Sequence, residues 1–228
     1  MQTVSPYRHQ LSKNVTRPLR IVAFGDSLIY GYGDSAGGGW VERLRRKWMN
    51  PELPGHVLYN LGIRGDTVAK VSQRLEREFG DRGELLNRQP DVIILSVGVN
   101  DSARKGNRQG KLFTDFDEFQ DKLVNLIERS QQLASVLFVG MVPVDESKMP
   151  FLDCFHFNHI DQYRYKQATK KLCAARNIPY LDIFDLWMER DENWLQAHLS
   201  SDGLHPNVSG YCALLEDVLS WQPFSQLA

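Results

Sequence analysis

The chain has 228 residues, of which 42% are hydrophobic and 24% are charged, and its formal net charge is -1 at pH 7. This length suits one α/β domain with a well-buried core. The balanced charge lacks the basic excess that nucleic acids or anionic membranes select, so we expect a protein that acts on a small molecule without nucleic acid.

The cysteines and the first residues indicate a reducing compartment. The chain has three cysteines, Cys154, Cys173 and Cys212, which are odd in number, widely spaced and without a CxxC pair. Such spacing argues against a disulfide framework or a zinc knuckle. Residues 1–20 lack the apolar core of a signal peptide, and the sequence has no apolar stretch of about 18 residues that could span a bilayer. We therefore expect a cytoplasmic protein with no integral membrane part.

The order of apolar segments predicts the architecture. Residues 1–18 have no apolar periodicity and predict a loosely ordered lead-in, followed by a single domain over 19–228. Apolar runs predict strands at 20–24, 57–61, 91–97, 136–142 and 178–182. Helical spacing predicts helices at 40–49, 68–79, 115–134, 160–176 and 207–221, while 144–157 is expected to be a long loop and 184–199 irregular or short-helical. Strands that alternate with helices predict a three-layer, doubly wound parallel sheet.

A serine follows the first predicted strand. The segment Gly25-Asp26-Ser27-Leu28 comes directly after it, where the chain must turn sharply. A hydroxyl at such a turn projects above the carboxyl end of the sheet, where open α/β proteins bind ligands. Ser27 is therefore a candidate nucleophile. The structural alternative is that Asp26 and Ser27 only cap the next helix.

A candidate base lies near the end of the chain. Asp202-Gly203-Leu204-His205-Pro206 places a carboxylate three residues before an imidazole, within reach of a hydrogen bond. Such an aspartate fixes the histidine tautomer and stabilises the imidazolium that forms when histidine takes a proton from serine. The segment predicts the acid and base of a Ser, Asp, His triad; alternatively, Asp202 caps a turn and His205 lies on the surface.

Acyl transfer also needs donors for the developing oxyanion. Candidates after predicted strands are the backbone N–H groups of Ser27 and Gly62 and the side-chain amide of Asn100. The alternatives remain that Gly62 serves only a turn and that Asn100 only caps a loop or helix. Two nearby carboxylates, Asp26 and Asp101, are expected to be structural.

The glycine-rich segment 31–39 and the segment 153–161 suggest other ligands. The glycines lack the ending of a P-loop and the spacing of a dinucleotide site, so nucleotide binding is disfavoured. Asp153, Cys154, His156, His159 and Asp161 are metal-ligating residue types, but they match no standard ligand pattern, and we expect no metal or other cofactor. The apolar residues of 149–157 predict a rim that contacts the acyl or aryl part of a substrate. The candidate substrate contacts are Tyr30, Met149, Phe151, Phe155 and Phe157.

Four segments together resemble the signature blocks of the GDSL family of SGNH hydrolases, in order and across residues 20–221. They are Gly25-Asp26-Ser27-Leu28, Gly62 within 60–67, Gly98-Val99-Asn100-Asp101, and Asp202-Gly203-Leu204-His205-Pro206. The resemblance implies a flavodoxin-like, five-stranded sheet with strand order 2-1-3-4-5 and metal-free serine esterase or lipase activity. It also implies that Ser27 is the nucleophile, Gly62 and Asn100 are oxyanion donors, His205 is the base and Asp202 orients the base.

These observations predict a serine esterase that favours short acyl or aryl esters. Lysophospholipase, thioesterase or sugar O-acetyl esterase activity on the same site is an open alternative. A ligand-binding domain that has kept the fold without the chemistry is the alternative from a different class. The oligomeric state does not follow from the sequence.

Overall fold

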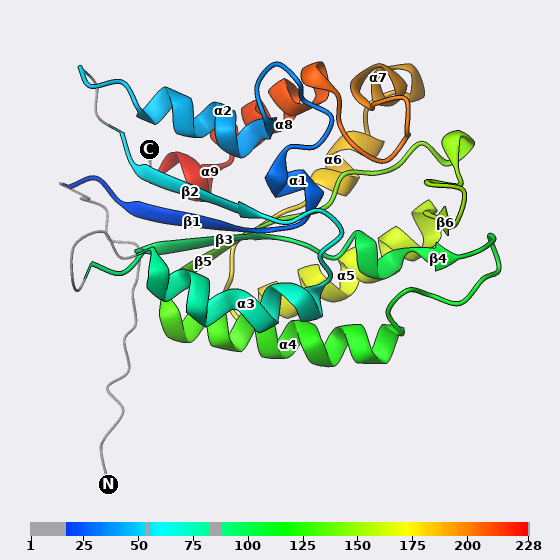
Figure 1. The fold of residues 1–228 in the computed structure, drawn as a ribbon, viewed down its shortest axis with the longest axis horizontal. Helices are drawn as coiled ribbons and strands as arrows, with labels where there is room; N and C mark the ends of the chain where they lie inside the picture. The colour runs from blue at the N-terminus through cyan, green and yellow to red at the C-terminus, as the bar shows by residue number, and fades with distance from the viewer. Residues whose placement is uncertain (1–16, 53–54, 83–87, 228) are drawn as a thin grey trace, which may run out of the picture.

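The computed structural model describes residues 17–52, 55–82 and 88–227 (Figure 1). The predicted lead-in at 1–18 therefore lies outside the described residues except for its last two positions, and the following account concerns the domain that comes after it.

Five parallel strands form the central sheet. In spatial order they are β2 (Val57–Gly62), β1 (Arg20–Gly25), β3 (Val92–Ser96), β5 (Ser135–Val139) and β7 (Tyr180–Leu181). Numbered along the chain, this order is 2-1-3-4-5, which confirms the expected doubly wound, flavodoxin-like topology. Every residue of β3 is buried, as expected for a central parallel strand that is covered on both faces.

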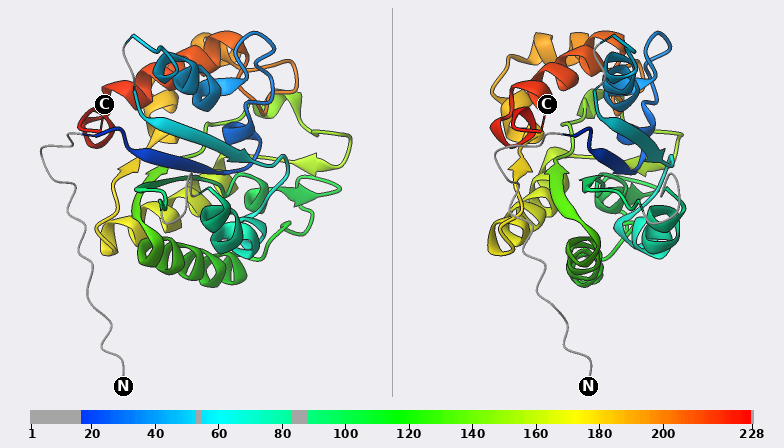
Figure 2. Two further views of the ribbon diagram at one scale, coloured as in Figure 1. Left: turned by 60° about the vertical axis from the view of Figure 1, so that its left-hand side comes forward. Right: turned by 90° about the vertical axis from the view of Figure 1, so that its left-hand side faces the viewer.

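Helices cover both faces of the sheet, so the fold has three layers (Figure 2). The α-helices are α1 (Ser27–Tyr30), α2 (Gly39–Trp48), α3 (Val68–Asp81), α4 (Phe116–Leu133), α5 (His159–Ala175), α6 (Ile183–Met188), α7 (Glu192–His198), α8 (Val208–Ser220) and α9 (Gln222–Ser225). Helices α2 and α8 pack together on one face, while α3, α4 and α5 lie on the other (Figure 1). Helices α2, α3, α4 and α8 each bury a mainly apolar stripe against the sheet, which places the core between the layers. The buried face of α5 is more polar and includes Asp161, Gln162 and Lys166.

The segment 144–157 has more structure than predicted. It contains a 3-10 turn, η2 (Glu146–Lys148), and the short strand β6 (Phe155–His156), which pairs with β4 (Arg104–Lys105) in a small antiparallel sheet. The periodicity of the sequence missed β6 because two residues are too few to establish a pattern. The predicted strand at 136–142 was too long, since β5 ends at Val139.

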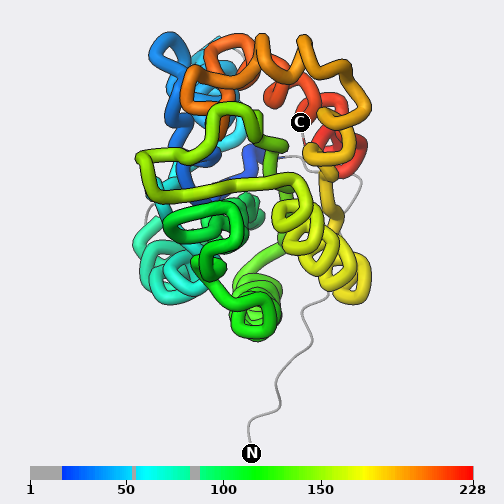
Figure 3. Tube along the Cα trace, turned by 90° about the vertical axis from the view of Figure 1, so that its right-hand side faces the viewer, coloured from blue at the N-terminus to red at the C-terminus, as the bar shows by residue number. Residues whose placement is uncertain are grey.

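The connections that carry polar residues meet at the carboxyl edge of the sheet. Figure 3 views the molecule from the side toward which the strands run, so that the loops after the strands face the reader. Gly25 ends β1 opposite both Gly62 and Ser96, and a Cβ at Gly25 would collide with the Ser96 carbonyl oxygen. Glycine at this position therefore lets β1 turn directly into Asp26 and Ser27. Within the described residues, no helix combines the length and the apolar character needed to cross a membrane.

Candidate active site

A chain of two hydrogen bonds joins the side chains of Ser27, His205 and Asp202. Ser27 is the first residue of α1, directly after the turn that ends β1. His205 Nε2 lies 2.8 Å from Ser27 Oγ, and His205 Nδ1 lies 2.8 Å from Asp202 Oδ2. The structure thus brings together three predicted residues that are separated by up to 178 positions in the chain.

The Asp202–His205 turn is fixed by its own backbone. Asp202 Oδ1 accepts the N–H groups of Leu204 at 2.9 Å and His205 at 3.0 Å, while Oδ2 faces the imidazole. Burial raises the pKa of Asp202, but the hydrogen bonds from the His205 side chain and from these N–H groups outweigh it, so that the pKa lies below its ordinary value. Asp202 is therefore held ionised beside the imidazole.

Two aromatic rings contact the imidazole. The ring centroid of His205 lies 4.7 Å from that of Tyr32 and 5.7 Å from that of Phe151, both in edge-to-face arrangements. Only 3% of His205 is exposed. These contacts restrict the orientation of the ring while Nε2 faces Ser27.

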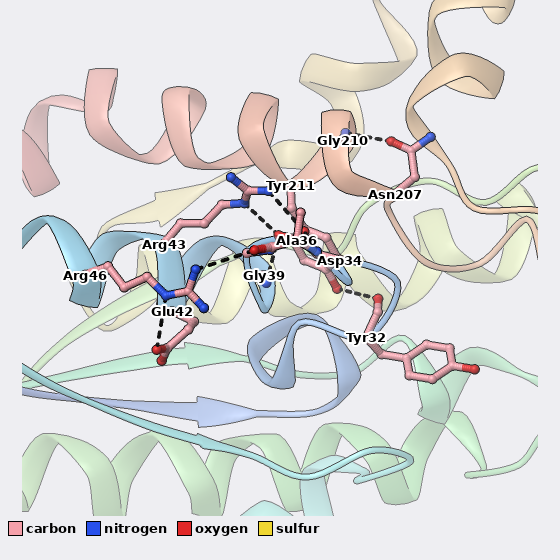
Figure 4. Close-up of polar contacts among 11 residues, drawn as sticks. Tyr32, Asp34, Ala36, Gly39, Glu42, Arg43, Arg46, Asn207, Gly210 and Tyr211 are labelled. Carbon is pink, nitrogen blue, oxygen red and sulfur yellow. Dashed lines mark hydrogen bonds and ion pairs between the residues drawn. The ribbon is translucent and has the colours of Figure 1, made fainter.

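The glycine-rich segment 31–39 supports Tyr32 and does not form a phosphate cradle. The carboxylate of Asp34 accepts the N–H groups of Ala36, Gly37 and Gly39 and is paired with Arg43 (Figure 4). The N–H groups of Ala36, Gly37 and Gly39 are therefore already used within the segment. In addition, the hydroxyl of Tyr211 donates to the carbonyl oxygen of Tyr32 at 3.0 Å, which fixes the backbone at Tyr32.

The structure contradicts the prediction that Gly62 supplies an oxyanion donor. The N–H of Gly62 donates to Asn60 Oδ1 at 3.0 Å, and the Asn60 side-chain amide in turn donates to the carbonyl oxygen of Ile29. A Cβ at Gly62 would collide with the backbone of Tyr30. Gly62 therefore serves the close packing of β2 against α1, and its N–H is not directed to the site.

Gly65, three residues later, occupies the position that was expected for Gly62. It lines the cavity that contains Ser27, has a φ of +77°, and would place a Cβ with no atom within 4 Å. No described residue accepts a hydrogen bond from its N–H. The sequence holds a signal for this residue, because Gly65 lies in the loop after β2 and directly before Asp66 and the helix cap Thr67.

Asn100 lies where it was predicted, in the 3-10 turn η1 (Asn100–Ser102) that follows β3. Its Nδ2 donates one hydrogen bond to the carbonyl oxygen of Asp66 at 2.9 Å, and the residue lines the same cavity as Ser27. An amide nitrogen has two hydrogens, so the second remains for a ligand. The bond to Asp66 also joins Asn100 to the loop that carries Gly65.

A cavity of about 330 Å³ opens beside Ser27 and His205. Its described lining is mostly apolar: Ser27, Arg64, Gly65, Asn100, Ala103, Phe113, Phe151, Leu152, Phe155, Phe157, Leu204 and His205. Phe151, Phe155 and Phe157 therefore lie at the cavity as predicted. Two other predicted substrate contacts do not: Tyr30 is 53% exposed and outside the lining, and Met149 packs against the core. Sequence reasoning missed Arg64, Phe113 and Leu204, because only the folded chain brings their loops together.

Two buried carboxyl groups lie beneath the site. Burial raises the pKa of Asp26 to about 7, and one oxygen of this side chain, Oδ2, has no hydrogen-bond partner among the described residues. Burial also raises the pKa of Asp101 to about 6, although Asp101 accepts hydrogen bonds from the Val68 N–H and the Thr114 hydroxyl. Asp26 caps α1 through the Leu28 N–H, and both carboxyl groups hold the loops around Ser27 and Asn100.

Two residues of the possible metal segment 153–161 are engaged in structural contacts. Asp161 forms an ion pair with Arg104, and His159 Nε2 lies 2.7 Å from the carbonyl oxygen of Val144. In the described part of the chain, no group of three or more His, Cys, Asp or Glu side chains is arranged to hold a metal ion.

Comparisons with known proteins agree with this fold. The chain matches the model of the GDSL-like lipase/acylhydrolase family over residues 23–213. It is 23% identical over 215 residues to the uncharacterized protein YpmR of Bacillus subtilis (strain 168), a match that covers 87% of this chain and 79% of YpmR. A solved lipase/acylhydrolase from Enterococcus faecalis has 22% identity and a TM-score of 0.67, with 88% of this chain and 94% of that chain covered. The psychrotrophic esterase EstA from Pseudoalteromonas sp., in a structure inhibited by monoethylphosphonate, has 20% identity and a TM-score of 0.62, with 87% and 93% covered.

At these identities, the solved structures show that the fold is shared. The family model, in contrast, spans most of the chain, including every residue of the described cavity lining from Ser27 to His205. The chain belongs to the GDSL-like lipase/acylhydrolase family, whose members are enzymes of the esterase and lipase type.

Proposed function

We propose that this protein hydrolyses carboxylic esters through an acyl-enzyme, with Ser27 as nucleophile, His205 as general base and Asp202 as the residue that orients the base. The observation that carries the proposal is the pair of 2.8 Å contacts that join Ser27 Oγ, the imidazole and the Asp202 carboxylate. In this arrangement a serine hydroxyl can lose its proton as it attacks a carbonyl carbon.

In the first half of the reaction, Ser27 Oγ attacks the ester carbonyl and His205 Nε2 takes the hydroxyl proton. The carbonyl oxygen becomes an oxyanion in the tetrahedral intermediate. As the intermediate collapses, the imidazolium gives its proton to the departing alcohol, and an acyl group remains on Ser27. Asp202, held ionised by its hydrogen bonds, stabilises the positive charge on the ring.

Three donors are available for the oxyanion: the backbone N–H groups of Ser27 and Gly65 and the side-chain amide of Asn100. Gly65 takes the role that the sequence assigned to Gly62, and its missing side chain lets the carbonyl group approach the N–H closely. Such donors act because they are already oriented when charge develops on the oxygen.

In the second half of the reaction, water replaces the alcohol. His205 takes a proton from the water as its oxygen attacks the acyl carbon, and the second tetrahedral intermediate collapses to a carboxylic acid with return of the proton to Ser27 Oγ. The cavity of about 330 Å³, with an aromatic wall, favours short acyl or aryl groups as substrates.

Labelling with a fluorophosphonate and analysis of the digested protein by mass spectrometry test this function. We expect one adduct on Ser27, loss of the adduct in Ser27→Ala, and a parallel loss of activity on p-nitrophenyl butyrate. A folded protein that forms no adduct and hydrolyses no ester of a graded acyl series would support the ligand-binding alternative.

A further inference from the structure

We propose that Arg64 forms an anion subsite at the mouth of the cavity, so that the preferred substrates are esters whose alcohol part carries a negatively charged group such as a phosphate or carboxylate. This inference rests on the proposed esterase function and adds the chemical class of the leaving alcohol. It begins with the charge of the cavity: Arg64 is the one Lys, Arg, Asp or Glu side chain in the described lining.

The guanidinium of Arg64 is stacked and held in place. Its central carbon, Cζ, lies 3.7 Å from the centroid of the Tyr32 ring. Stacking of this kind orients the planar guanidinium and leaves the N–H groups in its plane to donate, in the fork geometry that suits phosphate and carboxylate oxygens. The backbone that carries this ring is fixed, because the Tyr211 hydroxyl donates to the Tyr32 carbonyl oxygen, and the ring itself packs against His205.

Arg64 has no carboxylate partner of its own among the described residues. The nearest acidic residue in the chain, Asp66, is already paired with Arg74 at 2.9 Å. Elsewhere beside the cavity, the guanidinium of Arg104 is neutralised by Asp161. Arg64 therefore differs from these arginines, whose charge is used to fix a loop, because its positive charge remains available at the exposed edge of the cavity.

The position of Arg64 indicates which part of the substrate carries the anion. The acyl group fits the aromatic wall of Phe113, Phe155 and Phe157, which contributes no charged side chain to the described lining. The Lys105 ammonium lies 4.6 Å from the Phe113 ring centroid but is not part of that lining. The leaving oxygen must lie next to His205 Nε2, which protonates it. The Tyr32 ring contacts the His205 ring and also stacks with Arg64. Only this one ring therefore links the Arg64 guanidinium to the His205 imidazole. An anionic group on the alcohol part would therefore lie closest to the guanidinium.

The test uses two aryl butyrates that share the acyl group and differ at the para position of the leaving phenol: 4-carboxyphenyl butyrate, which is anionic, and 4-carbamoylphenyl butyrate, which is neutral. The ratio of their kcat/KM values is measured for the wild type, Arg64→Gln, Arg64→Lys and Arg164→Gln. Arg164 is a matched control, because it is an exposed arginine stacked on Phe116 at 3.8 Å and lies outside the cavity lining.

We expect Arg64→Gln to lower the charged-to-neutral ratio about tenfold, the effect of one charge-assisted hydrogen bond. Arg64→Lys should restore part of the ratio, and Arg164→Gln should leave it unchanged. Added salt should lower the wild-type ratio and have less effect on that of Arg64→Gln. Equal losses on both esters in Arg64→Gln would overturn the proposal and make Arg64 a support for Tyr32 alone.

Three further substrates test which part of the substrate carries the anion and whether the anion belongs to a soluble compound or to a lipid. A phenyl hemisuccinate puts the carboxylate on the acyl part, and an Arg64-dependent preference for this compound over the alcohol-side anion would overturn the proposal. Monomeric 1-butyrylglycerol phosphate and micellar 1-palmitoylglycerol phosphate distinguish a soluble phosphorylated alcohol from a lipid headgroup, and an Arg64-dependent rate on either supports the subsite.

The two proposals can fail separately. If the neutral ester is hydrolysed in a Ser27-dependent way and the ratio does not depend on Arg64, only the anion subsite is wrong. If no ester is turned over and Ser27 takes no fluorophosphonate label, the esterase function itself is wrong.

Discussion

The catalytic side and the aromatic wall of the cavity are held in place by different means. Ser27 begins α1 directly at the end of β1, and Asp202 and His205 are fixed by backbone hydrogen bonds within one turn. Except for Phe113, the wall comes from the segment 149–157, which is joined to its neighbour by the two-residue pairing of β4 and β6 and by the Gly106 N–H donating to the Cys154 carbonyl oxygen. The proposed reacting groups are thus anchored to the sheet, while most residues proposed to contact the acyl group lie on a loop that can vary without disturbing them.

The largest expected effect on the catalytic side comes from Asn100→Ala. We expect kcat on p-nitrophenyl butyrate to fall by about 10²–10³, because one preoriented oxyanion donor is lost. Asn125→Ala on α4 provides a control, since Asn125 contacts Ser72 and Arg129 far from the cavity lining. A wild-type kcat for Asn100→Ala, measured at equal fold stability, would remove Asn100 from the oxyanion hole.

The two glycines after β2 separate packing from catalysis. Gly62→Ala should lower the free energy of unfolding by about 1–3 kcal/mol, because its methyl group would be forced against the Tyr30 backbone. Gly65→Ala meets no neighbouring atom and loses only about 1 kcal/mol from its positive φ, but its methyl group projects into open space at the cavity edge and should lower kcat/KM.

Urea unfolding together with ester kinetics on both glycine variants checks this difference. Gly65 would be rejected as an oxyanion donor if Gly65→Ala kept the wild-type kcat/KM while Gly62→Ala lost activity without losing stability.

The buried carboxyl of Asp26 predicts a pH-dependent difference beneath the catalytic side. Burial raises its pKa from 3.8 to about 7, so the native state holds a proton that the unfolded state releases, and stability falls as the pH rises between these values. Asp26→Asn cannot ionise. Its free energy of unfolding should therefore increase relative to the wild type by about 1–2 kcal/mol between pH 6 and pH 8. If the difference in free energy of unfolding between Asp26→Asn and the wild type stayed constant from pH 6 to pH 8, the raised pKa of Asp26 would be contradicted.

The smallest expected effect lies on the aromatic wall. Phe155→Ala should change the ratio of kcat/KM between hexanoate and acetate esters by roughly fivefold, because a hydrophobic pocket discriminates weakly for each methylene. Fluorophosphonate labelling of Ser27 should persist in this variant. Tyr30→Ala is the comparison, since Tyr30 lies outside the cavity lining and should leave the ratio unchanged. A change in Tyr30→Ala equal to that in Phe155→Ala would place the acyl group elsewhere.

The parts of this structure that depend on local patterns could be predicted from the sequence. The alternation of apolar runs and helical stripes predicted the doubly wound parallel sheet, because parallel strands require helical crossovers. The strand order itself followed from the resemblance to the GDSL family. The Asp202–His205 pairing was predictable as well, since the two residues are only three positions apart.

Features that depend on exact strand ends and on contacts between loops were missed. Gly62 and Gly65 both follow the same apolar run, and only the bond from Gly62 to Asn60 shows which N–H is already occupied. Tyr30 was misplaced because its direction depends on how α1 sits on β2, with Gly62 pressed against it. Arg64 carries no local signal for a cavity, since its place there depends on its stacking with Tyr32.

The proposed acid and base are supplied within four consecutive residues, whereas the proposed nucleophile lies 178 positions earlier. A nascent chain that has emerged only as far as α7 therefore possesses the Ser27 hydroxyl but neither partner, and it acquires both at once when the final segment docks. Under the proposed function, ester hydrolysis would then report on completion of the fold, which makes turnover a sensitive assay for proper docking of the segment after α7.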